Sequence, residues 1–173
     1  MPPPLLSITG EVDHPLALDW AALAAVQPQV ADVSSLDPKR TGAAITLAGL
    51  LKLAQVRPAA KYLGLHSSRD DFHASIPLAA VKNSAVLIYS IDGQPLPLSA
   101  GGPIRFLVPD LAACHTAAAA DNIAGATDHS AEIDECANVK YLDSLELTSE
   151  RGYDNRPTEE EEHAELHRRQ GGQ

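Results

Sequence analysis

The stretch VLIYSIDGQPLPLSAGGPIRFLVP, residues 86–109, carries the strongest structural signals in the chain. Its nearly continuous apolar start, residues 86–91, predicts a buried strand. Asp92 and Gly93 then form a tight turn. Residues 104–108 predict a second strand, which ends before a proline. We therefore expect this part of the chain to form β-structure interrupted by an irregular connection rich in proline and glycine.

Strands and short helices alternate irregularly along the rest of the chain. Asp19 and Thr46 each offer an N-cap to a helical run, which begins at Trp20 and Leu47, respectively. The regular rhythm of parallel βαβ units is missing, so we expect an α+β fold with a mixed sheet and short helices. The other expected elements are strands at residues 5–12, 29–34, 43–46, 61–67 and 139–147, a polar loop at 68–73 and a helical turn after Pro77.

Length and composition indicate one soluble domain. The chain has 173 residues, 45% of them hydrophobic, and a formal charge of −10. No apolar run reaches the roughly 18 residues that cross a bilayer. Residues 1–6 contain three prolines and no basic cluster, so we expect no membrane partner and a cytoplasmic location. Lysines and arginines are scattered singly, which argues against a nucleic-acid partner. Composition leaves the oligomeric state open.

We expect the domain to span residues 1–148 and a polar tail to follow over residues 149–173. The tail begins with a polar arm, residues 150–157. Thr158 then caps a charged helix in which glutamates come first and arginines last, as the helix dipole favours. Such a helix is either a solvated tail or a docking element for a partner protein, and both interpretations stay open.

Four short segments occur in a fixed order along the chain. They are Ala74-Ser-Ile-Pro-Leu78, Asp92-Gly-Gln-Pro-Leu-Pro97, Gly101-Gly-Pro-Ile-Arg105 followed by Val108-Pro109, and Asn138-Val-Lys-Tyr-Leu142. Together they resemble the molybdopterin-binding domain of the sulfite oxidase family, in a form reduced in size. The resemblance implies that family's fold and, for an active member, a molybdopterin cofactor and oxidoreductase activity.

The third and fourth segments contain candidates for cofactor binding. Gly101 and Gly102 allow the backbone to approach a ligand closely. Arg105 is a bidentate donor for phosphate or anionic oxygens, and Lys140 is a point charge that could reach the same group. The same residues also fit a simple turn flanked by two surface cations, so the residues alone leave both interpretations open.

A polar cluster at the end of an expected strand offers further candidates for the cofactor pocket. His66, Ser68, Arg69 and Asp70 lie where ligand-binding loops often occur. A carboxylate near an imidazole is also suited to acid–base work. The alternative is a solvated loop in which an aspartate caps backbone N–H groups.

One residue that the resemblance implies is missing. In the family, a cysteine at the end of an early strand supplies a thiolate to molybdenum. The corresponding stretch here, residues 30–35, contains no cysteine, and Ser34 or Ser35 takes its place. For this reason we expect no bound molybdopterin.

Two functional hypotheses follow. The first is a molybdopterin-binding-type domain without molybdenum catalysis, which serves as a binding module for a small ligand or a protein. The second is an active molybdenum-cofactor oxidoreductase with an atypical metal ligand. The sequence does not decide whether the protein is an enzyme, because it identifies neither a substrate nor a catalytic residue.

The segment between the third and fourth motifs holds both cysteines. Cys114, His115, His129 and Cys136 have the right number and type of donors for one tetrahedral zinc or copper ion, although their spacing matches no known finger or ribbon. Free thiols and a Cys114–Cys136 disulfide remain as alternatives.

Overall fold

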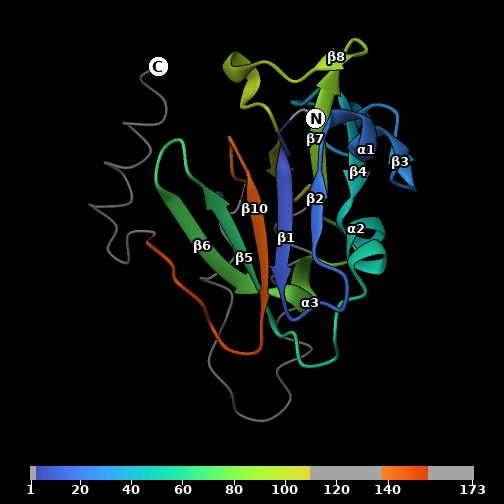
Figure 1. Ribbon diagram of the computed structural model, residues 1–173. Coiled ribbons are helices and arrows are strands. Elements are labelled where there is room, and N and C mark those ends of the chain that lie inside the picture. Colours follow the sequence, from blue (N-terminus) through green and yellow to red (C-terminus); the bar gives the residue numbers. More distant parts are fainter. Residues whose placement is uncertain (1–2, 110–137, 156–173) are drawn as a thin grey trace.

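The structure, a computed structural model, describes residues 3–109 and 138–155. Two β-sheets and short helices make up this part of the protein (Figure 1). The first sheet has the strand order β2-β1-β10-β5-β6. Its strands β1 and β10 run parallel and its other neighbours antiparallel, so it is a mixed sheet. The bounds are Leu6–Gly10 for β1, Leu16–Leu18 for β2, Tyr62–Ser67 for β5, Phe72–Pro77 for β6 and Ser144–Thr148 for β10.

The second sheet is antiparallel throughout and has the order β3-β4-β7-β8, with β9 also paired to β7. Its central strand β7 is the apolar run at the start of residues 86–109. The bounds are Gln29–Val30 for β3, Ala43–Thr46 for β4, Val86–Ile91 for β7, Gln94–Pro95 for β8 and Arg105–Leu107 for β9.

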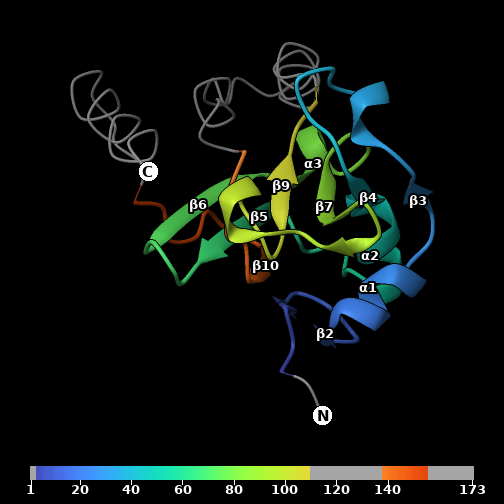
Figure 2. The same cartoon turned by 90° about the horizontal axis from the view of Figure 1, so that it is seen from above.

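The helices begin where the sequence places caps. The side chain of Asp19 accepts a hydrogen bond from the backbone of Ala22 at the start of α1 (Trp20–Ala25), and Thr46 does the same for Gly49 in α2 (Leu47–Ala54). A single turn, α3 (Leu78–Val81), follows Pro77. Seen from above, α1 and α2 lie on the side of the molecule formed by β2 and β4 (Figure 2).

The main core joins one face of each sheet. It combines side chains of both sheets with those of α2, whereas a smaller apolar cluster lies on the opposite face of the second sheet, beneath the loops that contain Val33 and Leu96. These two loops are therefore anchored to the sheet, which positions the residues they carry. Large, fully buried members of the main core are Leu6, Ile8, Ile45, Leu47, Leu50, Leu63, Leu65, Ile76, Leu87 and Phe106.

The α+β class is confirmed, but the strands form two sheets rather than one. The strand expected at 29–34 ends at Val30, because the side chain of Asp32 binds the backbone of Ser34 and starts a 3-10 turn, Val33–Ser35. The loop expected at 68–73 already becomes β6 at Phe72. The strand expected at 139–147 starts only at Ser144, since Tyr141 has a left-handed backbone with φ of 56°.

Within residues 3–109 and 138–155, no helix is both long and apolar enough to cross a membrane. The domain boundary at residue 148 stays a prediction.

Candidate functional site

Three cationic side chains from separate segments lie close enough to repel one another. Arg40 comes from the loop before β4, Arg105 from β9, and Lys140 from the segment before β10. Arg40 lowers the pKa values of Arg105 and Lys140 by charge repulsion, and Arg105 also lowers the pKa of Lys140. We call Arg40, Arg105 and Lys140 the cation cluster.

Two glycines let the cation cluster form. Gly101 has φ of +94°, and a Cβ built there would lie 3.1 Å from Cγ of Lys140 and 3.4 Å from Cδ of Arg105. A Cβ on Gly102 would lie 1.9 Å from the carbonyl oxygen of Leu96, so no larger residue fits without moving the backbone. The Gly-Gly turn thus brings the aliphatic parts of both cations against the same point of the chain.

Arg105 carries a charge that the protein solvates poorly. Burial lowers the pKa of its guanidinium, and repulsion from Arg40 lowers it further, whereas Tyr141 and Asp37 act in the opposite direction. One of its terminal nitrogens donates a long hydrogen bond, 3.4 Å, to the carbonyl oxygen of Ala100. The described residues therefore leave most of the donor capacity of this guanidinium unused.

Lys140 is in a similar situation. Burial lowers the pKa of its ammonium group first, and repulsion from Arg105 and Arg40 adds to the effect. Asp70 opposes it and raises the pKa. No ion pair between a carboxylate and any member of the cation cluster is present among the described residues.

Two buried nitrogens mark the cluster as incomplete. The Nε atoms of Arg40 and Arg105 are inaccessible to solvent and find no hydrogen-bond partner in the part of the chain that the structure describes. Buried donors are normally paired, and like charges that repel one another are stabilised by an anion. The arrangement is thus suited to hold a small anion with several acceptor oxygens, such as a phosphate.

Ser34 and Ser35 lie in the same loop as Arg40. Ser34 is half-buried, and its N–H donates to Asp32 at 2.9 Å. The hydroxyl of Ser35 donates to the carbonyl oxygen of Asp32 at 2.9 Å and is exposed. The loop therefore reaches the cation cluster through Arg40, and Ser34 has the less exposed hydroxyl.

The polar loop after β5 reaches the cluster at its edge. Asp70 acts electrostatically on Lys140, and the guanidinium of Arg69 lies 5.4 Å from the ring centre of Tyr141. The backbone N–H of Ser68 donates to the carboxylate of Asp143 at 2.9 Å. Asp70 and Arg69 thus border the cation cluster, whereas Ser68 serves to attach the loop to the segment before β10.

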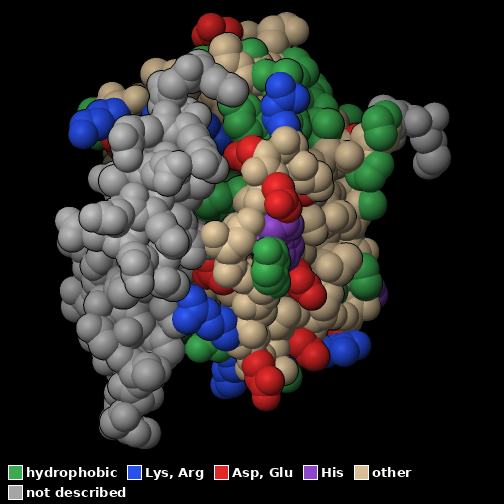
Figure 3. Space-filling view, turned by 90° about the vertical axis from the view of Figure 1, so that its left-hand side faces the viewer, with side chains coloured by type: hydrophobic (Ala, Val, Ile, Leu, Met, Phe, Trp, Pro, Cys, Tyr) green, Lys and Arg blue, Asp and Glu red, His purple; other side chains and the backbone are tan. Residues whose placement is uncertain are grey.

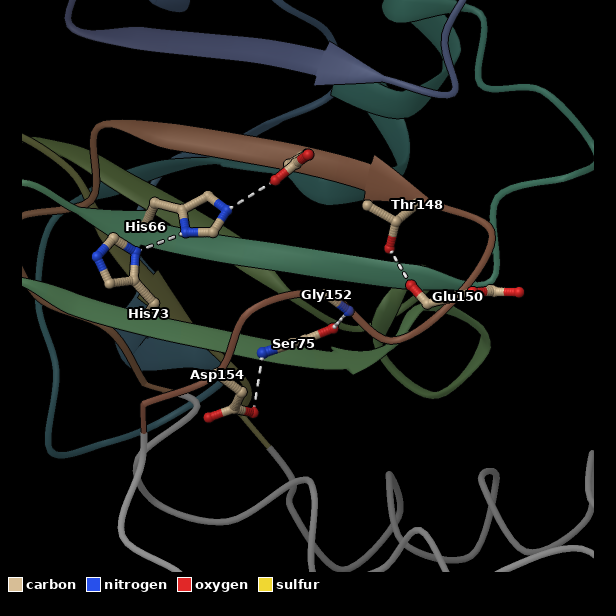
Figure 4. Close-up of polar contacts among 8 residues, drawn as sticks. His66, His73, Ser75, Thr148, Glu150, Gly152 and Asp154 are labelled. Atoms are coloured by element: carbon tan, nitrogen blue, oxygen red, sulfur yellow. Dashed lines mark hydrogen bonds and ion pairs between the residues drawn. The ribbon is translucent and has the colours of Figure 1, made fainter.

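The side chain of His66 is not brought to the cation cluster. Its Nδ1 atom lies 2.8 Å from Nδ1 of His73, and its Nε2 atom lies 3.2 Å from a carboxylate oxygen of Glu146. This residue belongs to a second polar group on the outer part of the first sheet (Figure 4).

Sequence reasoning did not identify Arg40 as a candidate site residue. The available signal was its position only five residues after Ser35, in a loop already expected to face a cofactor. The proposed zinc ligands Cys114, His115, His129 and Cys136 lie outside the described residues. Within the described ranges, no three residues of the types His, Cys, Asp and Glu are placed to hold a metal ion.

Comparison with known proteins agrees with the motifs that surround the cluster. A family model described as the oxidoreductase molybdopterin binding domain matches residues 41–132, which is more than half of the chain. The chain belongs to this family. The resemblance inferred from the four segments is thereby confirmed, and the family match includes Arg105 and both glycines of the turn.

A solved structure supports the same fold. The sulfane dehydrogenase SoxCD from Paracoccus pantotrophus matches with a TM-score of 0.55 and 17% sequence identity over 84% of this chain. The match spans 38% of the SoxCD chain, so the present domain is smaller than that enzyme chain. No curated protein sequence matches the chain.

Proposed function

We propose that this family member is a binding module for a small, phosphate-bearing ligand and does not perform molybdenum redox catalysis. The observation that carries the proposal is the cation cluster, in which Arg40 and Arg105 each have a buried Nε without a partner among the residues described. A charge that is costly to bury and repelled by its neighbours is favourable once an anion binds.

The cluster fits the phosphate end of a pterin cofactor. Two guanidinium groups can bind phosphate oxygens in bidentate fashion, and Lys140 adds a third charge. Gly101, which has no side chain, lets the side chains of Arg105 and Lys140 pack closely against the same point of the backbone. When bound with molybdenum, a molybdopterin would supply redox chemistry at a metal held by its dithiolene.

The metal end of that cofactor is fitted less well. A high-valent metal held by sulfur favours a soft thiolate as its protein ligand. The loop that carries Arg40 contains no cysteine and offers oxygen donors, among them the hydroxyls of Ser34 and Ser35, and the first cysteine of the chain is Cys114. The residues of the cation cluster are therefore suited to anion binding, and no described residue supplies a thiolate.

The test is to purify the protein from a host that makes the molybdenum cofactor. We expect no stoichiometric molybdenum by elemental analysis. In an NMR titration, inorganic phosphate should shift the amide signals of Gly101 and Tyr141, and an Arg105→Met variant should lose this response. A metal-free pterin released on oxidation would identify the ligand as the cofactor without its metal.

The rival function is an active oxidoreductase in which Ser34, Ser35, Cys114 or Cys136 provides the metal ligand. Stoichiometric molybdenum together with pterin would establish this rival and contradict our proposal. An unchanged spectrum up to millimolar phosphate would refute anion binding by the cation cluster, since even weak phosphate sites are occupied in this range.

A further inference from the structure

Four side chains form a line of hydrogen bonds across the outer face of the first sheet. Glu146 on β10 contacts Nε2 of His66 on β5 at 3.2 Å, and Nδ1 of His66 contacts Nδ1 of His73 on β6 at 2.8 Å. Nε2 of His73 then contacts a carboxylate oxygen of Asp71 at 3.0 Å. We call His66 and His73 the histidine pair (Figure 4).

The sheet is built to allow this line. His66 and His73 are directly opposite each other in the register of β5 and β6. A Cβ at Gly64 would lie 2.8 Å from Nε2 of His66 and 3.4 Å from Cβ of Glu146. Glycine at this position therefore leaves the space that the ring of His66 occupies when it lies over β5 and reaches Glu146.

The hydrogen bonds determine how many protons the pair holds. Ionised carboxylates only accept hydrogen bonds, so each Nε2 that faces one must carry a proton. The 2.8 Å contact between the two Nδ1 atoms requires one more proton, because two lone pairs facing each other at this distance repel. Three N–H protons on two imidazoles would give the pair one positive charge, between the carboxylates of Glu146 and Asp71.

A metal ion between the Nδ1 atoms fits the distance less well. Imidazole nitrogens bound to a tetrahedral zinc at about 2.0–2.1 Å from the metal would be roughly 3.3 Å apart. The observed 2.8 Å is the length of an N–H···N hydrogen bond.

The histidine pair lies beneath the beginning of the C-terminal tail. Residues 149–155, which we call the arm, leave β10 and run along the free edge of β6 (Figures 1 and 2). The ring of Tyr153 is 5.1 Å from the ring of His73, centre to centre, and is 66% exposed. Histidine side chains are visible at the surface on this side of the molecule (Figure 3).

The arm covers backbone groups that an edge strand would otherwise leave open. Asn155 accepts a hydrogen bond from the N–H of His73 and donates its own N–H to the carbonyl oxygen of the same residue. Asp154 accepts from the N–H of Ser75, and the N–H of Gly152 donates to the hydroxyl of Ser75. The amide of Asn155 also donates to the carbonyl oxygen of Asp71. The arm thus protects the edge of β6 from pairing with another strand.

We propose that the proton shared by His66 and His73 holds the arm on the edge of β6, and that uptake of a second proton by the pair releases it. Once both Nδ1 atoms carry a proton, two N–H groups lie face to face, so the rings must separate. His73 contacts the arm through its ring, its N–H and its carbonyl group. In addition, the carboxylate of Asp71 binds Nε2 of His73, and the backbone carbonyl group of Asp71 accepts a hydrogen bond from Asn155. Separation of the rings therefore weakens the contacts of the arm, and acidification uncovers the edge strand.

Titratable groups face the histidine pair from β10, from the turn before β6 and from the arm. Glu146 faces it from β10 and Asp71 from the turn before β6, while the arm contributes Tyr153. Arg151 and Asp154, which pair with each other at 3.4 Å, lie in the same arm. Asp154 also binds the backbone of Ser75, so its own protonation is a second acid-sensitive contact and must be separated from that of the pair.

The experiment is amide hydrogen exchange, followed by NMR on the full chain, at the N–H groups of His73, Ser75 and Gly152. After correction for intrinsic exchange, we expect these rates to rise at least about tenfold between about pH 7 and about pH 5, the range in which histidines change charge. The nitrogen-15 shifts of the pair should show three protonated ring nitrogens at neutral pH.

Two variants separate the sources of the effect. His66→Gln cannot take up the second proton, so the acid response should shrink to the part that Asp154 provides. His14→Gln removes an exposed histidine on another turn and should behave like the wild type. Identical acid responses in His66→Gln and wild type would overturn the proposal. Zinc that displaces the shared proton at neutral pH would also overturn it, because the bridging cation would then be a metal.

Discussion

The cation cluster and the histidine pair differ in whether their polar groups find partners within the described residues. In the histidine pair, every ring nitrogen faces another protein group, and the carboxylates of Glu146 and Asp71 close its two ends. In the cation cluster, three positive groups repel one another, and no carboxylate within the described ranges pairs with them. A satisfied group stabilises the fold by itself, whereas an unsatisfied one is costly until something binds. In our proposals, the histidine pair holds part of the chain in place and the cation cluster is reserved for a ligand.

The largest effect is expected from the turn on which the cluster rests. Gly102→Ala forces a Cβ against the carbonyl oxygen of Leu96, and we expect it to lower the free energy of unfolding by about 3 kcal/mol or more. Chemical denaturation measures this change. The control is Gly93→Ala, where φ is +75° but nothing lies within 4 Å of the new Cβ; its cost should be only about 1 kcal/mol. Because Gly102 has no left-handed φ, a cost no larger than that of Gly93→Ala would show that the backbone at Leu96 moves aside and that the close approach is not decisive.

The second-largest effect concerns Arg105, whose replacement should weaken phosphate binding but raise the stability of the ligand-free protein. Arg105→Met keeps the volume of the side chain but removes a partly buried charge that Arg40 repels. We expect phosphate to bind about 100-fold more weakly and the ligand-free protein to gain about 1 kcal/mol of stability. Calorimetric titration and thermal unfolding provide the two measurements.

Arg57→Met is the matched control, since Arg57 is exposed and pairs with Asp13 at 2.9 Å. It should leave phosphate affinity unchanged and give no stability gain, because an exposed ion pair contributes little. A loss of stability in Arg105→Met would mean that the charge of Arg105 supports the fold and is not reserved for a ligand.

The third effect is the response of Lys140 to pH. Burial and the two arginines lower the pKa of Lys140 in the folded protein relative to the unfolded chain. Between the two values the unfolded chain binds more protons, so the free energy of unfolding rises with pH in that window. The rise should be less than about 1 kcal/mol, because the side chain is partly exposed to screening solvent.

Lys140→Met should lose this alkaline rise, and Lys52→Met, an exposed lysine on α2, should keep it. Urea unfolding at several values from about pH 7 to about pH 10.5 gives the comparison. Phosphate affinity of the wild type should fall in the same window, because the lysine loses its charge there. An identical slope in the wild type and Lys140→Met would contradict the assignment.

Much of the fold follows from local signals in the sequence. The caps Asp19 and Thr46, the apolar run of β7 and the turn at Asp92 act within a few residues, and each was predicted. Strand β6 was missed because its polar residues His73 and Ser75 look like a loop until the arm, which follows about eighty positions later, binds their backbone.

The candidate site likewise combines residues that the sequence predicts with residues that only long-range strand pairing brings together. Gly101, Gly102, Arg105 and Lys140 were predicted as a group because they lie in motifs with a family resemblance. The third cation of the cluster, Arg40, could not be predicted from its neighbours, since only the pairing of β4 with β7 brings its loop to β9. His66 was assigned to the cofactor pocket, but the cross-strand register places its ring opposite His73. Long-range pairing decides both cases.

The smallest effect defines where the cation cluster ends. Arg69 is exposed and lies 5.4 Å from the ring centre of Tyr141, a cation–π contact that contributes about 0.5–1 kcal/mol at such a site. Arg69→Ala should therefore weaken phosphate binding less than about threefold, because solvent already screens this charge. Tyr141→Phe keeps an aromatic ring for the guanidinium and should retain the contact. If Arg69→Ala weakened phosphate binding as much as Arg105→Met, Arg69 would be a fourth member of the cluster, and the distinction between buried and exposed cations would no longer explain which of them bind the ligand.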